Sequence, residues 1–473
     1  MPAEEPLDLR QARHIHVVGI GGAGMSAIGL VLRAMGHDVS GSDLKDSPVA
    51  QRLGSQGISV AVGHRAGNVA GADVVTYSPA VAPDNVELVA ARESGAHVAP
   101  RSEILAAICA TRRCLAVSGT HGKTTTASLL ALILHQAGRD PSFLIGGLPV
   151  DFGRSFRLGG GPHFLAEGDE YDSAFFDKRP KFVHYLPDVA VIGNVEYDHA
   201  DIYPDLAAVQ TAFVRLLNVI PRRGLLVAGA ESPPLREILA RAPCRVETFG
   251  IGGDADWRAV NVRPGPDAWR FSLQLRGRDR GEFALGLPGE HNVRNALAAL
   301  AVVAEAGVPP EAARAALAAF QGVKRRLEVR GRARGVTVYD DFAHHPTAVR
   351  ETLKALRAAG GGGRLVAVFE PRSYSSRTSV FQEDFGRAFR TADLVVVAAA
   401  HLPGKVPEGR RLSESGLVDA LRGQGTEARF IPDVPDIVTA LSAELREGDR
   451  VVLLSNGGFG GIHEKLLRAL ERT

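Results

Sequence analysis

The chain has 473 residues, more than one ordinary hydrophobic core needs, and fits about two to four domains. Hydrophobic residues make up 45% of it and charged residues 23%, and no apolar run approaches the roughly eighteen residues that cross a bilayer. The formal net charge of +2 comes from bases and acids spread along the chain without blocks of like charge. We therefore expect no nucleic acid and no membrane as partner.

The cysteines and the first residues bear on the cellular compartment. Cys109, Cys114 and Cys244 are an odd number, at spacings that form neither a zinc knuckle nor a disulfide framework. We expect them to be small buried apolar residues. The first fourteen residues are polar and carry no signal-peptide core. The prediction is a cytoplasmic protein.

The first predicted unit is a strand, a glycine turn, a helix and a second strand within residues 14–43. Gly19, Gly21 and Gly24 give the spacing G-x-G-x-x-G, and Asp43 ends the next strand. Such a turn lets the backbone approach a diphosphate at a helix N-terminus. Taken alone, the turn favours a nicotinamide cofactor over other diphosphates, and a purely structural tight turn is the alternative. Further strands near residues 73–77 and 97–99 complete a small α/β unit.

A second strand, loop and helix begin at Cys114. The loop GTHGKTTT resembles a phosphate loop, although Val117 stands where the usual pattern has a glycine. Lys123 follows Gly122 and precedes Thr124, so backbone amides, a lysine and a hydroxyl that can ligate Mg²⁺ converge on a nucleotide triphosphate. We predict nucleotide binding here.

The two turns together restrict the kind of activity. A dehydrogenase has no use for ATP hydrolysis, and an ATP-driven motor or switch has no use for a second diphosphate pocket. An ATP-driven joining enzyme needs both sites, one for ATP and one for a substrate with its own diphosphate.

Acidic side chains and a histidine follow the next two predicted strands, at residues 164–166 and 189–192. Glu167 can reach a Mg²⁺ ion on the γ-phosphate, and His199 can complete a second ion. The alternative for both is a solvated loop charge. Five more acids add negative charge, and the sequence does not say which point inward: Asp169, Glu170, Asp172, Glu196 and Asp198.

The second unit ends near residues 322–330, after two predicted helices. His291, Asn292 and Asn295 open the first of these helices after a glycine turn, where amide side chains can recognise an adenine edge. A plain N-cap is the alternative for Asn292.

The third unit alternates strands, at residues 336–339, 365–369, 394–398 and 451–454, with amphipathic helices. Asp340, Asp341, His344 and His345 cluster at the end of its first strand, the edge where open α/β sheets hold ligands. The glycines at 360–363 lie between a helix and a strand and predict a flexible loop.

Two further features of this unit suit an anionic acceptor. Arg372 in FEPRS follows a strand, and a guanidinium pairs with a carboxylate through two parallel bonds, with Arg377 as a weaker second candidate. The glycines of SNGGFGG, from Gly457 to Gly461, precede a helix, and their amides could form an anion nest. A helix-entry turn that needs glycine only for its dihedral angles is the alternative.

Over essentially its whole length, the chain resembles the Mur ligase family, whose shortened phosphate loop matches GTHGKTTT. The resemblance implies an α/β fold in three domains: an N-terminal Rossmann-like domain for a UDP-sugar, a central P-loop ATPase-like domain and a C-terminal Rossmann-like domain for the incoming amino acid or peptide. We place them at residues 1–105, 106–328 and 329–473. The glycine turn then resembles a UDP-binding turn, not a nicotinamide one.

The resemblance also implies a role for each matching position. The residues expected at ATP are Gly119, Thr120, His121, Gly122, Lys123, Thr124, Thr125, His291, Asn292, Asn295, Arg326 and Asp341. Those expected at the UDP-sugar are Gly19, Gly21, Gly22, Gly24, Met25, Ser26, Asp43, Ser78 and Asn194. Lys123, Glu167 and His199 are expected to be catalytic, and Thr124, Glu167 and His199 to hold the metal. The residues expected at the peptide are His344, His345, Arg372, Gly457 and Gly458.

Within the family, the segments GDEYDSAFFDKRPKFVHY, YDDFAHHPTAV, FEPRS and LLSNGGFGGIHEKLL most resemble members that add a tripeptide during peptidoglycan recycling. The N-terminal GIGGAGMSAIG is more similar to members that add L-alanine. Those members have D-D-Y-G-H-H-P where this chain has Phe342 and Ala343. No lysine occurs between His199 and Lys324, so the carbamylated lysine of several relatives has no counterpart.

The implied reaction uses ATP and Mg²⁺ to join UDP-N-acetylmuramate to L-alanyl-γ-D-glutamyl-meso-diaminopimelate, with L-alanine as the alternative acceptor. The lactyl carboxylate takes the γ-phosphoryl group of ATP to form an acyl phosphate, and the acceptor amine then displaces phosphate. An NAD-dependent oxidoreductase is the alternative from a different class.

Overall fold

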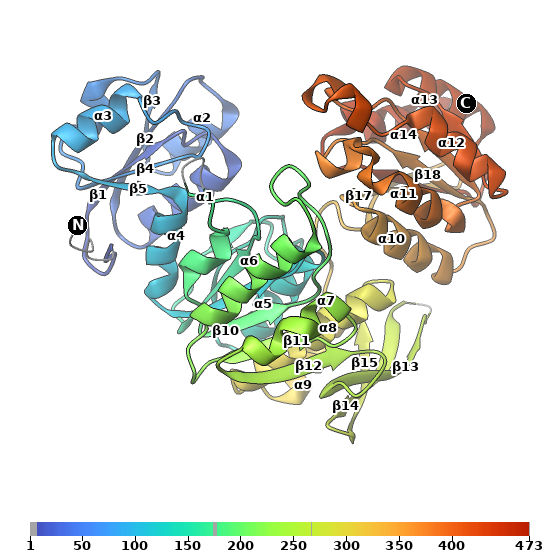
Figure 1. Ribbon diagram of the computed structural model, residues 1–473, viewed down its shortest axis with the longest axis horizontal. Helices are drawn as coiled ribbons and strands as arrows, with labels where there is room; N and C mark the ends of the chain where they lie inside the picture. Colours follow the sequence, from blue (N-terminus) through green and yellow to red (C-terminus); the bar gives the residue numbers. More distant parts are fainter. Residues whose placement is uncertain (1–6, 174–176, 266, 473) are drawn as a thin grey trace.

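The computed structural model describes residues 7–173, 177–265 and 267–472, and of Ala23 only the backbone. Residues 1–6, within the segment searched for a signal peptide, and residues 174–176 of the motif GDEYDSAFFDKRPKFVHY lie outside the described part. The described chain forms three α/β lobes, each built on one sheet (Figure 1). This confirms the predicted fold class.

The N-terminal lobe contains a five-stranded, fully parallel sheet in the order β3-β2-β1-β4-β5. Its strands are β1 His14–Val18, β2 Asp38–Asp43, β3 Ser59–Val62, β4 Val74–Tyr77 and β5 His97–Pro100, and its helices are α1 Ala23–Ala34, α2 Pro48–Ser55, α3 Val86–Glu93 and α4 Arg101–Ala110. The strand order reverses between β1 and β4, the point at which such sheets bind ligands beyond the strand ends. The predicted glycine turn, between β1 and α1, lies at this point.

The central lobe contains a ten-stranded sheet in the order β15-β14-β13-β12-β11-β10-β6-β9-β7-β8. Its strands are β6 Arg113–Ser118, β7 Ser142–Leu144, β8 Phe156–Arg157, β9 His163–Gly168, β10 Val189–Ile192, β11 Leu225–Gly229, β12 Arg245–Gly250, β13 Trp257–Arg263, β14 Trp269–Leu275 and β15 Arg278–Leu285. Its helices are α5 Lys123–Gln136, α6 Leu206–Val219, α7 Pro233–Ile238, α8 Glu290–Glu305 and α9 Pro310–Ala319. The strands β6, β9 and β10, predicted from short apolar runs, are adjacent and parallel.

Helix α5 is buried from Thr124 to Leu134, and α8 packs beside it against the sheet. A helix that is apolar on every side is stable only inside a core, which explains the run ASLLALIL. The antiparallel extension β13–β15 was not predicted. Its strands alternate apolar and polar residues, and Trp257, Trp269 and Phe271 on their inner face complete the core under α8.

The C-terminal lobe contains a six-stranded sheet in the order β16-β17-β21-β18-β19-β20. Its strands are β16 Glu328–Ala333, β17 Val336–Asp341, β18 Leu365–Phe369, β19 Leu394–Val397, β20 Glu427–Phe430 and β21 Arg450–Leu454, and its helices are α10 Pro346–Ala358, α11 Gln382–Ala388, α12 Glu414–Gly423, α13 Val434–Glu444 and α14 Ile462–Arg472. Only β16 runs antiparallel to its neighbour. The predicted ligand edge, after Asp341, faces the central lobe.

Helix α4 connects the first two lobes, and the predicted domain boundary at residue 105 falls inside this helix. Its apolar face, including Leu105 and Ile108, belongs to one cluster with the N-terminal core and with Phe164 and Tyr185 of the central lobe. The first two lobes therefore share apolar packing, whereas the C-terminal lobe has its own clusters on the two faces of its sheet.

Two smaller predictions can be compared with the fold. Cys109 and Cys114 are buried, as the sequence predicted, whereas Cys244 is only half-buried; all three are free thiols. In the described residues, no helix combines the length and the apolar character that crossing a bilayer requires.

Candidate active site

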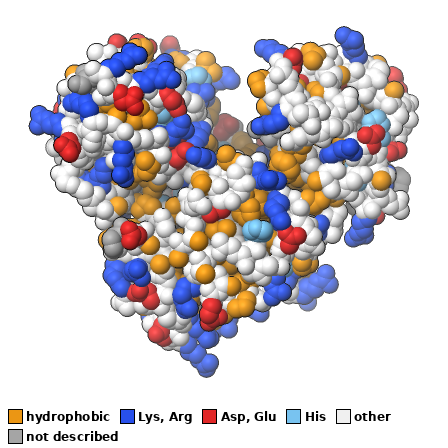
Figure 2. Space-filling model, turned by 180° about the vertical axis from the view of Figure 1, so that it is seen from behind, with side chains coloured by type: hydrophobic (Ala, Val, Ile, Leu, Met, Phe, Trp, Pro, Cys, Tyr) orange, Lys and Arg blue, Asp and Glu red, His pale blue; other side chains and the backbone are white. Residues whose placement is uncertain are grey.

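A large cavity of about 1550 Å³ lies where the three lobes meet. Its walls come from the start of α1 and α4, from the loops after β6, β9 and β10, from the start of α8 and from the segment after β17. Seen from behind, the molecule is hollowed between its two upper lobes (Figure 2). Residues from distant parts of the sequence thus face one common space.

The phosphate loop lies between β6 and α5, and two glycines give it its shape. Gly119 and Gly122 have φ angles of 126° and 85°, which favour glycine, and Gly122 is the N-cap residue of α5. A Cβ atom on Gly122 would overlap the side chain of Asn295. The close approach of the loop to α8 therefore also requires glycine.

Lys123 is held between an oxygen of its own loop and a buried acid. Its Nζ donates to Gly119 O at 2.7 Å and to Glu170 Oε2 at 2.8 Å. Burial opposes the charge on this lysine, but the carboxylates of Glu170, Asp169 and Glu167 raise its pKa above the usual value. The ammonium group is thus permanently charged inside the cavity.

Glu170 also contacts His199, whose Nε2 lies 3.3 Å from Glu170 Oε1. Glu170 is buried, yet Lys123 and His199 lower its pKa to about 2. Burial opposes the charge on His199 as well, but Glu170 and Asp198 raise its pKa. Lys123 and His199 therefore share one carboxylate at the position expected for the transferred phosphate.

Thr124 and Glu167 lie on the other side of the loop. Thr124 Oγ1 donates to Glu167 Oε2 at 3.0 Å, and Gly146 N donates to Glu167 Oε1 at 2.7 Å. Burial and Asp169 raise the pKa of Glu167. Hydroxyl and carboxylate oxygens are the ligands that Mg²⁺ prefers, so this pair fits a Mg²⁺ ion, which would also relieve the cost of the buried charge.

The predicted adenine side lies in the first turn of α8, next to the phosphate loop. Gly289 is the N-cap of this helix, so the alternative that Asn292 is a plain N-cap is wrong. Asn292 Nδ2 donates to Pro288 O at 2.7 Å, and Asn295 Nδ2 donates to Asn292 Oδ1 at 3.2 Å. His291 is half-buried, desolvation lowers its pKa to about 4, and its Nδ1 has no hydrogen-bond partner in the described part of the chain.

Arg326 and Asp341 come from either side of the junction with the C-terminal lobe, and both line the cavity. Asp341 accepts from Leu327 N at 2.7 Å and from Ala343 N at 2.8 Å. The guanidinium of Arg326 lies over the ring of Phe342, 4.6 Å from its centroid. The aromatic residue that replaces tyrosine in the motif therefore supports an arginine expected at the phosphates.

The expected UDP-sugar residues are arranged around the first glycine turn. Asp43 Oδ2 accepts from Gly21 N at 2.8 Å, and Gly19 has a φ of 76° next to Ser78. Gly22 is the N-cap of α1, Gly24 lies at the cavity wall, and Ser26 is buried within the helix. The side chain of Met25 is buried and packs in the N-terminal core.

Asn194 lies elsewhere, at the carboxyl end of β10. Its Oδ1 accepts from His121 N at 2.9 Å, and its Nδ2 donates to His121 O at 3.3 Å. Both halves of the amide thus fasten the phosphate loop, next to Thr120 N, which donates to Asn194 O at 3.1 Å.

The predicted acceptor residues are divided between two places. His344 and His345 line the main cavity, whereas Arg372, Gly457 and Gly458 lie outside its lining. Gly457 N donates to Ser455 Oγ, and Gly461 N donates to Gly458 O at 3.0 Å. These amides form hydrogen bonds within the turn that leads into α14. The alternative of a simple helix-entry turn predicts this arrangement.

Arg372 and Arg377 differ in how they are held. Arg372 lies against Gly457 and 3.7 Å from Glu370 Oε2. Arg377 is buried and its Nη1 donates to the carbonyls of His401 and Leu402. Arg372 is therefore the better placed of the two for a ligand carboxylate.

Several residues that line the cavity were not predicted as site residues, among them Glu170, Glu196, Arg101 and Asn456. Glu170 and Glu196 were noted only as acidic residues, and no spacing rule distinguishes them from their neighbours. Arg101 lies against Gly24, and its Nε is buried without a hydrogen-bond partner. Asn456 precedes the glycines of SNGGFGG, and its Oδ1 is also buried and unpaired in the described chain. The sequence feature that could have identified Asn456 is its position in this glycine motif.

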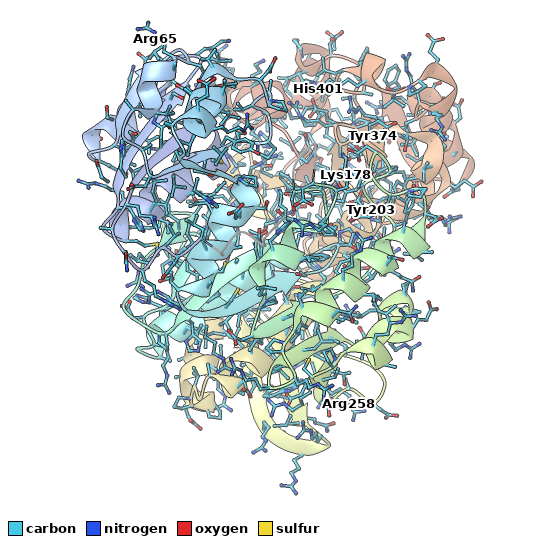
Figure 3. The ribbon with its side chains drawn as sticks, turned by 60° about the vertical axis from the view of Figure 1, so that its left-hand side comes forward. Arg65, Lys178, Tyr203, Arg258, Tyr374 and His401 are labelled. Atoms are coloured by element: carbon cyan, nitrogen blue, oxygen red, sulfur yellow. The ribbon has the colours of Figure 1, made fainter. Side chains whose placement is uncertain are left out.

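The C-terminal lobe contacts the central lobe beside this site. His345 Nε2 donates to Tyr197 O at 3.1 Å, Thr347 Oγ1 donates to Glu196 Oε2 at 2.6 Å, and Ala200 N donates to Ser375 Oγ at 3.3 Å. Figure 3 labels Tyr203 and Tyr374 on the two loops that make the last contact. The orientation of the lobes is thus set by a few polar contacts around the cavity.

Comparison with known families accounts for nearly all of this chain. Residues 14–113 match the Mur ligase family catalytic domain, residues 117–303 the Mur ligase middle domain and residues 325–457 the Mur ligase glutamate ligase domain.

Individual relatives match over the whole length. The UDP-N-acetylmuramate–L-alanine ligase of Acidovorax sp. (strain JS42) is 41% identical over 98% of both chains. The crystal structure of a murein peptide ligase from Psychrobacter arcticus is 32% identical, with a TM-score of 0.69 over 98% of this chain and 99% of that one. The UDP-N-acetylmuramate–alanine ligase from Thermotoga maritima is 26% identical, with a TM-score of 0.77 over 97% and 99%.

Proposed function

Because this chain belongs to the Mur ligase family, we propose that it uses ATP to join the lactyl carboxylate of UDP-N-acetylmuramate to the amine of an acceptor. The chain is an ATP-dependent ligase of peptidoglycan synthesis that uses ATP and Mg²⁺. These matches give no support to the oxidoreductase alternative.

One observation carries the proposal: the pairing of Lys123 and His199 with Glu170 in the cavity, beside the pair Thr124 and Glu167. Phosphoryl transfer needs little covalent help, so fixed cations and oriented donors supply most of the acceleration. When the phosphate oxygens of ATP enter the cavity, Lys123 and His199 can release Glu170 and contact these oxygens instead. A bound Mg²⁺ ion, held by Thr124 and Glu167, would neutralise the phosphate oxygens.

The two steps follow from leaving groups. A carboxylate is a poor acyl donor, so the lactyl oxygen first attacks the γ-phosphorus of ATP, and ADP leaves. The neutral acceptor amine then attacks the carbonyl carbon, the C–O bond to phosphate breaks, and the amine proton passes to solvent. His199, at the cavity wall, and the side chains of the phosphate loop hold the reacting groups in place.

We propose the following roles for the remaining predicted residues. The first glycine turn, with Asp43 and Ser78, holds the UDP-sugar; His291, Asn292 and Asn295 hold the adenine; Arg326 and Asp341 hold the phosphates and ribose. The corresponding domains are residues 1–105 for the UDP-sugar, 106–328 for ATP and 329–473 for the acceptor.

L-Alanine is the acceptor named in the relatives that match the whole chain at about 40% identity, such as the Acidovorax ligase at 41%. The comparisons support L-alanine better than a tripeptide. His344 and His345 lie in the cavity next to the phosphate loop, where a small amino acid could reach the reacting carbonyl.

The tripeptide L-alanyl-γ-D-glutamyl-meso-diaminopimelate is the second candidate, and residues on the acceptor side favour it. Phe342 and Ala343 replace the tyrosine and glycine of the alanine-adding motif, and Arg372 offers a guanidinium beyond the main cavity. Among the two full-length structures compared, the murein peptide ligase has the higher identity, at 32% against 26%.

A single assay tests the proposal and distinguishes the acceptors. Phosphate release is measured with ATP, Mg²⁺ and UDP-N-acetylmuramate, adding either L-alanine or the tripeptide. Release that depends on both the sugar nucleotide and one acceptor supports the ligase, and the acceptor with the higher kcat/KM is the substrate. ATP hydrolysis that needs no sugar nucleotide, or saturable NADH binding, would contradict the proposal.

A further inference from the structure

A second group of possible metal ligands lies beside the phosphate loop, separate from Thr124, Glu167 and His199. His121, Glu196 and His345 each offer one ligand atom, and these atoms all lie within 4.8 Å of one another. His121 Nε2 lies 3.5 Å from Glu196 Oε2, and His345 Nδ1 lies 3.8 Å from the same oxygen. Within the chain that the structure describes, these are the residues that come together in this way.

His345 presents an unprotonated nitrogen to this cluster. Its Nε2 donates to Tyr197 O at 3.1 Å, and its Nδ1 accepts from Thr347 N at 3.3 Å. The carbonyl therefore fixes the tautomer in which Nδ1 carries the lone pair, and an ion that binds this nitrogen replaces the long hydrogen bond from Thr347 N. An imidazole whose other nitrogen donates to a backbone carbonyl is the usual arrangement of a metal-bound histidine. Burial and the neighbouring His121 lower the pKa of His345 to about 4, which keeps the ring neutral.

His121 supplies the independent observation. Its Nε2 is buried in the cluster and has no hydrogen-bond partner among the described residues. The backbone of His121 is fixed on both sides by the amide of Asn194. A buried imidazole nitrogen that makes no hydrogen bond is costly in a rigid loop, and an ion between His121 Nε2 and Glu196 Oε2, which lie 3.5 Å apart, would remove this cost.

Glu196 completes the set as a charged ligand. Thr347 Oγ1 donates to its Oε2 at 2.6 Å, so the carboxylate is itself oriented. Two imidazole nitrogens and one carboxylate oxygen suit Zn²⁺ and related transition metals rather than Mg²⁺, which prefers oxygen.

We propose that His121, Glu196 and His345 bind one transition-metal ion of the zinc class, at a site distinct from the Mg²⁺ positions on the ATP phosphates. Ligand distances of about 2.0–2.2 Å require the three atoms to move closer by roughly 1 Å, which side-chain rotation can supply. His121 belongs to the phosphate loop and His345 is the N-cap of α10, so the ion connects the central and C-terminal lobes.

The test uses the full-length, metal-free protein and Co²⁺ as a spectroscopic probe. We expect one equivalent of Co²⁺ to give the intense visible bands of tetrahedral coordination, displaced by one equivalent of Zn²⁺ but not by excess Mg²⁺. The variants His121→Asn, Glu196→Gln and His345→Asn should each weaken binding by at least about tenfold. His344→Asn and His199→Asn are matched controls that should keep the spectrum.

Thermal unfolding gives a second measurement that does not depend on the spectrum. Zn²⁺ should raise the Tm of the wild-type protein and of His344→Asn, and leave the Tm of His345→Asn unchanged. The proposal is overturned if the wild-type protein shows neither the spectrum nor the rise in Tm. It is equally overturned if His199→Asn, and not His345→Asn, loses binding, because the ion would then occupy the Mg²⁺ position.

Discussion

The ammonium group of Lys123 donates hydrogen bonds to two oxygen atoms, Gly119 O and Glu170 Oε2. Replacing Lys123 with alanine leaves the buried Glu170 with His199 as its remaining cationic contact. We expect Lys123→Ala to lower kcat by about 100-fold or more, because a fixed charge at the transferred phosphate is lost. Binding of UDP-N-acetylmuramate should remain, since its glycine turn lies in the N-terminal lobe.

Product formation by chromatography and sugar-nucleotide binding by calorimetry measure these two effects separately. Lys123→Arg is a useful companion, because it keeps the charge and changes the shape. Equal loss of sugar-nucleotide binding and of catalysis would contradict the separation of the two sites.

The contacts of Glu170 lead to a prediction about the stability of the folded protein at low pH. Burial opposes the charge on Glu170, but Lys123 and His199 lower its pKa from the usual 4.5 to about 2 in the folded protein. A group with a depressed folded pKa contributes stability above its unfolded pKa and loses it as the pH falls through the folded value. The difference in free energy of unfolding between the wild-type protein and Glu170→Gln should therefore decrease as the pH falls from 4.5 to 2.

Urea unfolding of both proteins at several pH values measures this difference. Glu237→Gln, an exchange of an exposed glutamate on α7, is the control and should show no such narrowing. A constant difference between wild-type and Glu170→Gln across this range would contradict the assignment.

Several elements could be predicted because their signals are local. The strand before each phosphate-binding turn is a short apolar run, and glycine spacing marks the turn itself, as in GTHGKTTT. The antiparallel strands β13–β15 could not be predicted in the same way, because their arginines and single tryptophans also suit a loop. Their pairing depends on packing against α8. This contact joins segments that are not adjacent in the sequence, so no local pattern predicts it.

The start of α5 depends on Gly122, which allows a prediction at this scale. Alanine at a φ of 85° costs about 1–2 kcal/mol, and its Cβ would also overlap Asn295. We expect Gly122→Ala to lower both the free energy of unfolding and the affinity for ATP. Gly54→Ala is the control: nothing lies within 4 Å of its added Cβ in α2, so helix stability should rise by about 0.5–1 kcal/mol.

Urea unfolding and calorimetric titration with ATP measure the two variants. If Gly122→Ala binds ATP as the wild-type protein does, the loop does not need its left-handed residue and the argument fails.

The contact between the central and C-terminal lobes rests on few hydrogen bonds, and Thr347 makes one of them, to Glu196. Removing a hydrogen bond to a charged group costs about 1.5–3 kcal/mol. Thr347→Val should therefore loosen this contact and increase the radius of gyration measured by small-angle X-ray scattering. Thr211→Val is the control, because that hydroxyl bonds only to Ala207 O in its own helix. Scattering curves that coincide for all three proteins would rule out this role of Thr347.

At the scale of the whole molecule, the sequence predicted which residue types form the site but not which of them meet. Lys123, Glu167 and His199 line one cavity, because they lie at or beyond the carboxyl ends of three adjacent parallel strands, β6, β9 and β10. The contacts of Glu170 with two cations, and of Glu196 with a residue of another lobe, depend on side-chain direction and lobe orientation. Neither is encoded in spacing along the chain.

Helix α4 packs the N-terminal core against Phe164 and Tyr185 of the central lobe, whereas the C-terminal lobe encloses apolar clusters that are almost entirely its own. A recombination event near residues 322–328 would therefore exchange the last third of the gene without exposing a core. A lineage could in this way keep its sites for the sugar nucleotide and ATP unchanged and acquire a site for a new acceptor in one step. Grafting the C-terminal segment of a tripeptide-adding relative onto residues 1–322 should yield a folded hybrid whose amine preference follows the graft.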